Sequence, residues 1–161
     1  MNLPSKLVSL RKAVSIARRL QRKGKKDAFT NGTFDLLHLG HVTYLQKARR
    51  QADVLILGLN SDASVKSYKG PGRPLNPQKD RALVLSALAC VDYVVIFNEP
   101  TPLKLIAAIR PDVLVKGADW PKSKIAGAGL VESWGGKVRR IRLVPGRSTT
   151  RLIQLMEKGA R

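Results

Sequence analysis

The stretch FTNGTFDLLHLGHVTYLQKAR, residues 29–49, joins a short β-rich run to a helical segment through a turn rich in glycine and threonine. Both histidines of the chain, His38 and His41, lie in it, one on each side of Gly40. Gly32 allows a tight turn, and Gly40 lets the backbone come close to a ligand. A helix that begins there directs unpaired N–H groups and the positive end of its dipole into the turn. The stretch therefore predicts a strand–turn–helix unit with an anion site, to which the two imidazoles add donors for phosphate oxygens.

Two other roles for the histidine pair stay open. The pair could hold a metal ion, but a zinc site needs a third and a fourth ligand, and Asp35 is the only close candidate. The histidines could also be ordinary core or surface residues. The adjacent glycines, Thr33 and Asp35 favour the phosphate site.

The order of apolar and helical segments predicts the fold class. Five short apolar runs read as strands, at residues 28–30, 54–60, 93–97, 113–117 and 137–144. Helical patterns separate or follow them at 40–51, 78–90, 101–109, 123–134 and 148–158. This alternation indicates an α/β fold with a doubly wound five-stranded parallel sheet. Ligands bind such sheets at the carboxyl ends of the strands, where the strand order reverses.

An amphipathic helix is predicted over residues 5–22, with Ser5 as its N-cap and Gly24 at its end. We expect residues 1–24 to form a helical extension and residues 25–161 to form one domain around a single core. The helix must bury its apolar stripe on its own domain or on a partner, so a homodimer is possible.

The charge of the chain points to anionic partners. Its 161 residues carry 30 Lys and Arg against 11 Asp and Glu, a net charge of +19, and nine bases without an acid fall within residues 1–26. Nucleic acids and phosphorylated metabolites both fit this charge. Aromatic residues do not alternate with the basic clusters, which argues against a nucleic-acid-binding module.

Other features bound the location and the kind of site. No apolar run approaches the roughly 18 residues of a membrane helix, so we expect no membrane association. The single cysteine, Cys90, lies in an apolar segment and is expected to be a buried thiol in the cytoplasm. GxxxxGK[ST] is missing, and GAGLVE at 127–132 fails GxGxxG. Residues 66–80 read as a mobile loop over the site or as a plain surface connection.

The segment TNGTFDLLHLGH resembles the signature of the HxGH nucleotidyltransferases, the cytidylyltransferase-like superfamily. Four further segments, RPLNPQKDRALVLSAL, VDYVVIFNEPTP, RPDVLVKGADW and VPGRSTTRLI, resemble the D-glycero-β-D-manno-heptose 1-phosphate adenylyltransferase branch, without its sugar kinase domain. The resemblance covers residues 25–157. It implies a Rossmann-like nucleotidyltransferase fold that joins ATP to a heptose 1-phosphate for lipopolysaccharide core or related glycan synthesis, with Mg²⁺ accompanying the triphosphate.

The resemblance also implies roles for particular residues. His38 and His41 would be catalytic, stabilising charge on the triphosphate. Nucleotide contacts are implied for Thr30, Asn31, Gly32, Thr33, Phe34, Gly40, Arg81, Gly117, Arg147, Ser148, Thr149 and Thr150. Substrate contacts are implied for Asp35, Asn60, Lys116 and Asp119.

Several of these roles have alternatives. Asp35 and Asp119 could orient substrate hydroxyls, meet the magnesium ion or form a structural salt bridge. Arg81 and Lys116 could be solvated surface charges, and Ser148 could be only an N-cap.

Two positions depart from the family pattern. Thr33 replaces the cysteine or other small residue often found there. Thr43 stands where the related glycerol phosphate cytidylyltransferases carry a lysine, so the cation would come from Lys47, Lys66 or Lys69. An acceptor other than heptose, such as glycerol 3-phosphate with CTP or FMN with ATP, is the alternative.

Overall fold

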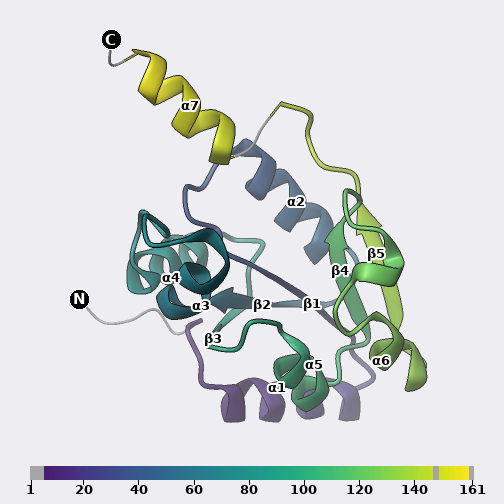
Figure 1. Cartoon of the computed structure of the whole chain (residues 1–161). Coiled ribbons are helices and arrows are strands. Elements are labelled where there is room, and N and C mark those ends of the chain that lie inside the picture. The colour runs from purple at the N-terminus through teal and green to yellow at the C-terminus, as the bar shows by residue number, and fades with distance from the viewer. Residues whose placement is uncertain (1–5, 147–148, 160–161) are drawn as a thin grey trace.

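A parallel sheet of five strands forms the centre of the protein (Figure 1). This computed structural model describes residues 6–146 and 149–159. The strands are β1 (Asp27–Gly32), β2 (Val54–Asn60), β3 (Tyr93–Phe97), β4 (Val113–Gly117) and β5 (Lys137–Ile141), in the order β3-β2-β1-β4-β5. The chain adds strands on one side of β1 and then returns to its other side, so the order reverses between β1 and β4. The predicted doubly wound parallel sheet is confirmed.

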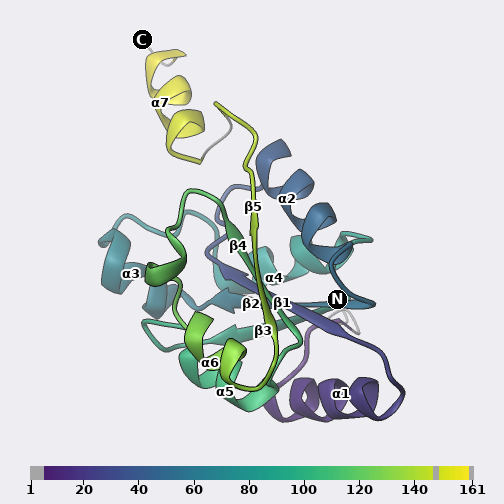
Figure 2. The same cartoon turned by 90° about the vertical axis from the view of Figure 1, so that its right-hand side faces the viewer.

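Helices cover both faces of the sheet. They are α1 (Leu10–Arg22), α2 (Leu39–Arg49), α3 (Asp62–Lys69), α4 (Gln78–Ala87), α5 (Leu103–Ile109), α6 (Ala128–Ser133) and α7 (Thr149–Gly159), with a 3-10 turn, η1, at Lys122–Lys124. Side chains of α2 and α4 share one core cluster with the sheet, and side chains of α1, α5 and α6 share another on the opposite face. In both views α7 extends outward from the rest of the fold (Figures 1 and 2).

The alternation of faces follows from residues next to each other in the strands. Ala28 packs with the α2 and α4 cluster, whereas Phe29 packs with the α1, α5 and α6 cluster. Leu55 and Ile56 divide in the same way. These strands are apolar at consecutive positions because both faces of a parallel sheet are buried.

The N-terminal segment differs in detail from the prediction. Ser9 is the N-cap of α1, and its side chain accepts a hydrogen bond from the Lys12 N–H at 3.2 Å. The residues just before it extend beside β3, where Leu7 pairs with Val94. Ser5 lies outside the described residues. α1 buries Ala13 and Ala17 against its own fold, where it packs on α5 and β3.

Three further segments differ from the sequence prediction. Residues 62–69 form α3, which Ser61 caps by accepting a hydrogen bond from the Ser64 N–H, so residues 66–69 are helical and only the rest of 66–80 connects to α4. The helix predicted at 123–134 is interrupted before Gly127, whose φ of +86° is left-handed. β5 ends at Ile141, short of residue 144, because its partner strand β4 ends at the paired Gly117.

Cys90 is a free thiol that is partly exposed and packs at the edge of the core, so it is less buried than predicted. Burial raises the pKa of this thiol. Within the described part of the chain, no helix combines the length and the apolar character needed to cross a membrane.

A buried carboxyl group lies at the start of β1, at the end of the sheet opposite the predicted site. Asp27 is fully buried at the start of β1, and its side-chain oxygens have no hydrogen-bond partner among the described residues. Its backbone N–H donates to the Asp112 carboxylate at 3.0 Å. Burial, together with the neighbouring Asp112, raises the pKa of Asp27 to about 7.

This pKa predicts how stability depends on pH. In the unfolded chain the Asp27 carboxyl ionises near pH 3.8, and in the folded protein only near pH 7. The free energy of unfolding should therefore fall as pH rises through this window, by up to about 4 kcal/mol at about 1.4 kcal/mol per pKa unit. Urea unfolding of wild type and Asp27→Asn at a series of pH values measures it. The variant should lack this decline, and parallel profiles for the two proteins would contradict the assignment.

Candidate active site

A cavity of about 330 Å³ opens where β1 and β4 end, at the reversal of strand order. Both histidines line it, although they are far in sequence from the β4 residues that form its opposite side. The predicted site residues that line it are Asn31, Gly32, Thr33, Phe34, His38, Gly40, His41, Lys116, Gly117, Asp119 and Thr149. The structure thus brings most of the sequence-predicted residues to one place.

The two histidines form a stacked pair at the start of α2. His38 is the N-cap residue, with extended backbone angles, and its ring lies 3.8 Å from the ring of His41 between centroids. The edge of Phe34 packs against His41 at 5.1 Å between ring centroids. The Nδ1 atom of His38 is buried without a hydrogen-bond partner among the described residues. The pair thus lies beside a helix N-terminus, which favours anions, with buried Nδ1 atoms that have no partner among the described residues.

The environment keeps both imidazoles neutral. Burial lowers the pKa of His38. Burial, reinforced by the nearby His38, lowers the pKa of His41 to about 4. At neutral pH the rings are N–H donors without a charge, and a triphosphate placed beside them would favour the protonated form.

A titration tests this state of the histidines. By NMR, neither imidazole should titrate at the ordinary histidine pKa of 6.5, and His41 should titrate near pH 4. Addition of inorganic tripolyphosphate should raise both pKa values, because the anion stabilises the imidazolium. His38→Asn assigns the signals. A His41 midpoint at 6.5 or above in the free protein would contradict the burial of this imidazole.

Lys116 and Asp119 both line the β4 side of the cavity. Lys116 and Gly117 end β4, and Asp119 follows two residues later. The Lys116 ammonium donates to the Asn31 carbonyl at 3.3 Å and lies 5.9 Å from the ring centroid of Trp120. Burial lowers the pKa of Lys116 to about 8, and Asp119 opposes part of that shift. Lys116 is not a solvated surface charge.

A second cavity of about 480 Å³ adjoins the first. Both are lined by Asn31, Gly32, Thr33, Lys69, Lys116 and Trp120, and the second extends to Asn60, Tyr68 and Lys124. The hydroxyl groups of Thr33 and Tyr68 are hydrogen-bonded to each other. The region is therefore a two-part cleft with lysines on its shared wall.

Of the three lysines suggested as the missing cation, only Lys69 lines these cavities. It belongs to the last turn of α3. Burial lowers the pKa of its ammonium, and the positive charge of the nearby Arg73 lowers it further. Lys47 and Lys66 are exposed and line neither cavity.

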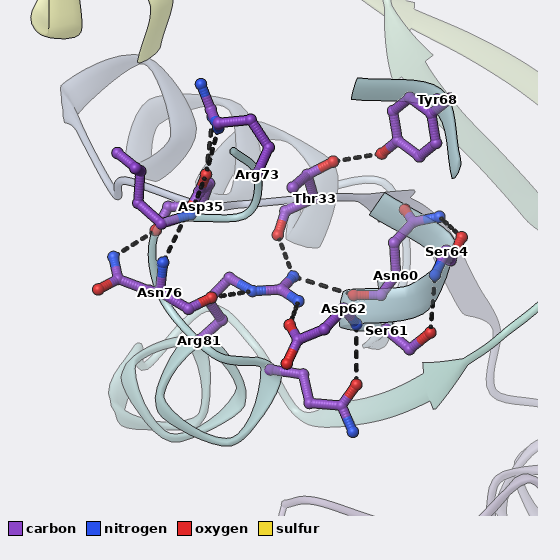
Figure 3. Close-up of polar contacts among 12 residues, drawn as sticks. Thr33, Asp35, Asn60, Ser61, Asp62, Ser64, Tyr68, Arg73, Asn76 and Arg81 are labelled. Carbon is purple, nitrogen blue, oxygen red and sulfur yellow. Dashed lines mark hydrogen bonds and ion pairs between the residues drawn. The ribbon is translucent and has the colours of Figure 1, made fainter. Parts of the chain in front are cut away.

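Arg81 has a structural position that its sequence context did not reveal (Figure 3). Its Nε donates to the Asn76 carbonyl at 2.9 Å, and its Nη1 donates to the carbonyls of Thr33 at 2.6 Å and Asn60 at 2.9 Å. Its Nη2 pairs with Asp62 at 2.7 Å. The side chain is fully buried and lines neither of the two cavities. Arg81 is therefore neither a surface charge nor part of the lining of the histidine cavity.

Asp35 likewise holds a loop (Figure 3). Its carboxylate accepts hydrogen bonds from the backbone N–H groups of Leu75 and Asn76 at 2.9 Å and pairs with Arg73 at 2.7 Å. Burial would raise the pKa of Asp35, but these donors outweigh it, so the pKa is lowered. Asp35 lines a separate hollow of about 320 Å³ beneath α7 and not the histidine cavity. The structural salt bridge considered from sequence is what the structure contains.

The remaining predicted residues support or border the cleft. Thr30 is buried, and its hydroxyl is hydrogen-bonded to that of Tyr44 at 2.7 Å. Gly32 is the last residue of β1 and not a turn residue; a Cβ there would lie 2.9 Å from the Phe34 ring, so the close approach of that ring requires glycine. Arg147, Ser148 and the side chain of Thr150 lie outside the described residues.

Sequence reasoning missed several cleft residues. Trp120, Tyr44, Leu143, Tyr68 and Lys124 line the two cavities. Trp120 had a local signal, because it directly follows Asp119 at the end of β4. Tyr44 also had a local signal, because it lies one turn after His41 on the same helix. Leu143, Tyr68 and Lys124 reach the cleft from segments that only the tertiary structure brings there.

Among the described residues, no further side chains are placed to hold a metal ion together with the histidine pair. Across residues 6–146 and 149–159, no group of three histidine, cysteine or acidic side chains is arranged to hold a metal ion. Asp35, the third ligand considered from sequence, is occupied by its loop contacts. One carboxylate, that of Asp119, lines the histidine cavity. This fits Mg²⁺ held largely by substrate phosphates, since that ion often takes only one or two protein carboxylates.

The Arg81 network gives a prediction that separates its two possible roles. Arg81→Met leaves three carbonyls and Asp62 without their donor, so we expect a loss of about 3 kcal/mol or more in the free energy of unfolding. Lys79→Met, on the exposed side of the same helix, is the control. Chemical unfolding and ATP binding by calorimetry measure both effects. Unchanged stability with lost ATP binding would instead make Arg81 a phosphate ligand.

A protein-family model that includes the histidine pair matches most of the chain. The chain belongs to the cytidylyltransferase-like family, whose model matches residues 29–156. It is 58% identical over 146 residues to the "Bifunctional protein HldE" of Syntrophotalea carbinolica, covering 91% of this chain and 29% of that protein. It is 55% identical over 152 residues to the protein of the same name from Paramagnetospirillum magneticum, covering 94% and 31%. The chain thus spans about a third of the length of these relatives.

Solved structures agree with the fold. A lipopolysaccharide core biosynthesis protein from Thermoplasma volcanium superposes with a TM-score of 0.60 at 27% identity, over 75% of this chain and 98% of that one. A pantoate-β-alanine ligase from Francisella tularensis gives a TM-score of 0.60 at 17% identity, over 94% of this chain and 76% of the other, which shows the fold alone.

Proposed function

We propose that the chain is an adenylyltransferase that joins ATP to D-glycero-β-D-manno-heptose 1-phosphate, giving ADP-heptose and pyrophosphate. The observation that carries the proposal is the histidine pair facing Lys116 across a cavity at the strand-order reversal. The relatives named HldE and the structural neighbour from lipopolysaccharide core biosynthesis support the sugar class. The five sequence motifs that resemble the heptose branch support the same acceptor.

The reaction needs no general base on the protein. A sugar 1-phosphate has a second pKa near 6 and is already largely dianionic at neutral pH. One of its oxygens attacks the α-phosphorus of ATP, an O–P bond forms, and the bond from the α-phosphorus to the bridging oxygen breaks. Pyrophosphate leaves with that electron pair. The protein must supply position and positive charge rather than a proton acceptor.

The residues of the cleft meet that need. The neutral N–H groups of His38 and His41 can donate to triphosphate oxygens, and the first N–H groups of α2 lie beside them. Thr149, at the start of α7, lines the same cavity and can add a hydroxyl donor. The adjoining 480 Å³ cavity has room for a sugar phosphate, with Asn60 and Tyr68 as polar groups for its hydroxyls.

Magnesium is part of the proposal. The ion neutralises charge on the β- and γ-phosphates when bound with ATP. Asp119, which lines the histidine cavity and whose negative charge raises the pKa of Lys116, is the residue that would hold the ion.

A substrate panel tests the function. Pyrophosphate release is measured with ATP or CTP against heptose 1-phosphate, glycerol 3-phosphate and FMN, with and without Mg²⁺. We expect turnover with ATP and the heptose phosphate, and a loss of about 10² to 10³ in kcat for His41→Ala, typical of removing one charge-stabilising donor. Lys47→Ala, exposed on the same helix, is the control. Turnover only with another acceptor would overturn the assigned substrate, and full activity of His41→Ala would overturn the site.

A further inference from the structure

The two cavities of the cleft meet at a short shared wall. Only two of the six residues common to both are cations, Lys69 and Lys116. If one cavity holds the triphosphate and the other the sugar phosphate, the reacting oxygen and phosphorus meet at this wall. A cation there touches both substrates, whereas one elsewhere touches only one.

The two lysines are held differently. Lys69 is exposed at the end of α3, directly before Gly70, whose φ of +88° ends the helix. Lys116 is half-buried on β4, inside the sheet, where its backbone is paired with β5 at Arg140. A group fixed on a strand keeps its position during the reaction, which charge stabilisation requires.

The Lys116 ammonium also has donors to spare. Its one hydrogen bond, to the Asn31 carbonyl, is long at 3.3 Å, and none of the ion pairs found among the described residues includes it. An ammonium has three N–H donors, so two remain for phosphate oxygens. Burying a cation without an ion-pair partner costs free energy, and an anionic ligand bound beside it would offset that cost.

Among the described residues, α2 contributes no lysine or arginine to the lining of the histidine cavity. Lys116 approaches this cavity from β4, on the side opposite the histidines.

We propose that Lys116 is the catalytic cation of this enzyme, bridging the attacking oxygen of the acceptor phosphate and a non-bridging oxygen of the α-phosphate in the transition state. It stays protonated throughout and donates hydrogen bonds rather than a proton. The proposal rests on the in-line transfer described above, though not on the identity of the acceptor.

Three variants test the role by kinetics with the acceptor that wild type turns over. Lys116→Met keeps the length of the side chain without its charge, and kcat should fall by about 10² to 10³ while ATP affinity changes by less than about tenfold. Lys116→Arg keeps the charge and should retain more activity than Lys116→Met. Lys47→Met, on the exposed part of α2, is the control and should match wild type.

The pH profile gives a readout that a purely structural role would not produce. Burial lowers the pKa of Lys116 to about 8 in the free protein, so the wild-type kcat/KM should decline as pH rises through that value and the ammonium is lost. An arginine remains charged there, so the decline should move to higher pH in Lys116→Arg. Thermal unfolding of each variant checks that the fold is intact.

The failures of the two proposals are distinguishable. If wild type makes ADP-heptose while Lys116→Met keeps its kcat within about threefold, or loses only acceptor affinity, the bridging role is overturned and the proposed function stands. If wild type turns over a different acceptor, the proposed substrate fails, and the same variants still test Lys116 with that acceptor.

Discussion

The reversal of strand order between β1 and β4 is the constraint on which the rest of the structure depends. The helices α2 and α4, which follow β1 and its neighbour β2, pack over one face of the sheet, whereas α6, which follows β4, packs over the opposite face. Neither connection covers the gap between the two strand ends, so a crevice remains there. The histidines approach that crevice from one side and Lys116 and Asp119 from the other.

A buried charge network keeps the walls of this crevice in place. Arg81 joins the loop after β1, the end of β2 and the segment before α4 through carbonyls and Asp62, and Asp35 fixes the neighbouring loop through Leu75 and Asn76. A buried guanidinium is costly unless every donor is satisfied, and here its donors face fixed carbonyl oxygens. The carbonyl of Thr33 is one of them, while the side chain of the same residue lines the cleft. Fold stability and site geometry are therefore coupled at these residues.

Much of the fold could be predicted from sequence, because buried parallel strands are continuous apolar runs and their helices show regular periodicity. The histidine cavity was also accessible, since its residues follow directly after β1 and β4. The roles of Arg81 and Asp35 were not, because a charged side chain in a polar segment looks the same whether it faces a ligand or its own backbone. Ser61 is a residue type that often caps helices, so the start of α3 had a signal in the sequence. The helix was nevertheless missed because it is short and lies in a segment rich in turn residues. The wall shared by two cavities depends on side chains from β1, α3 and β4 together, which no local pattern encodes.

The mechanism depends on where a nucleotide binds relative to the histidine pair and Lys116. A crystal structure with a non-hydrolysable ATP analogue and Mg²⁺ measures this most directly. It should show the β- and γ-phosphates against His38 and His41, with the α-phosphate within hydrogen-bond distance of the Lys116 ammonium. A nucleotide bound away from the strand-order reversal, or one whose α-phosphate is turned from both β1 and β4, would contradict the central claim.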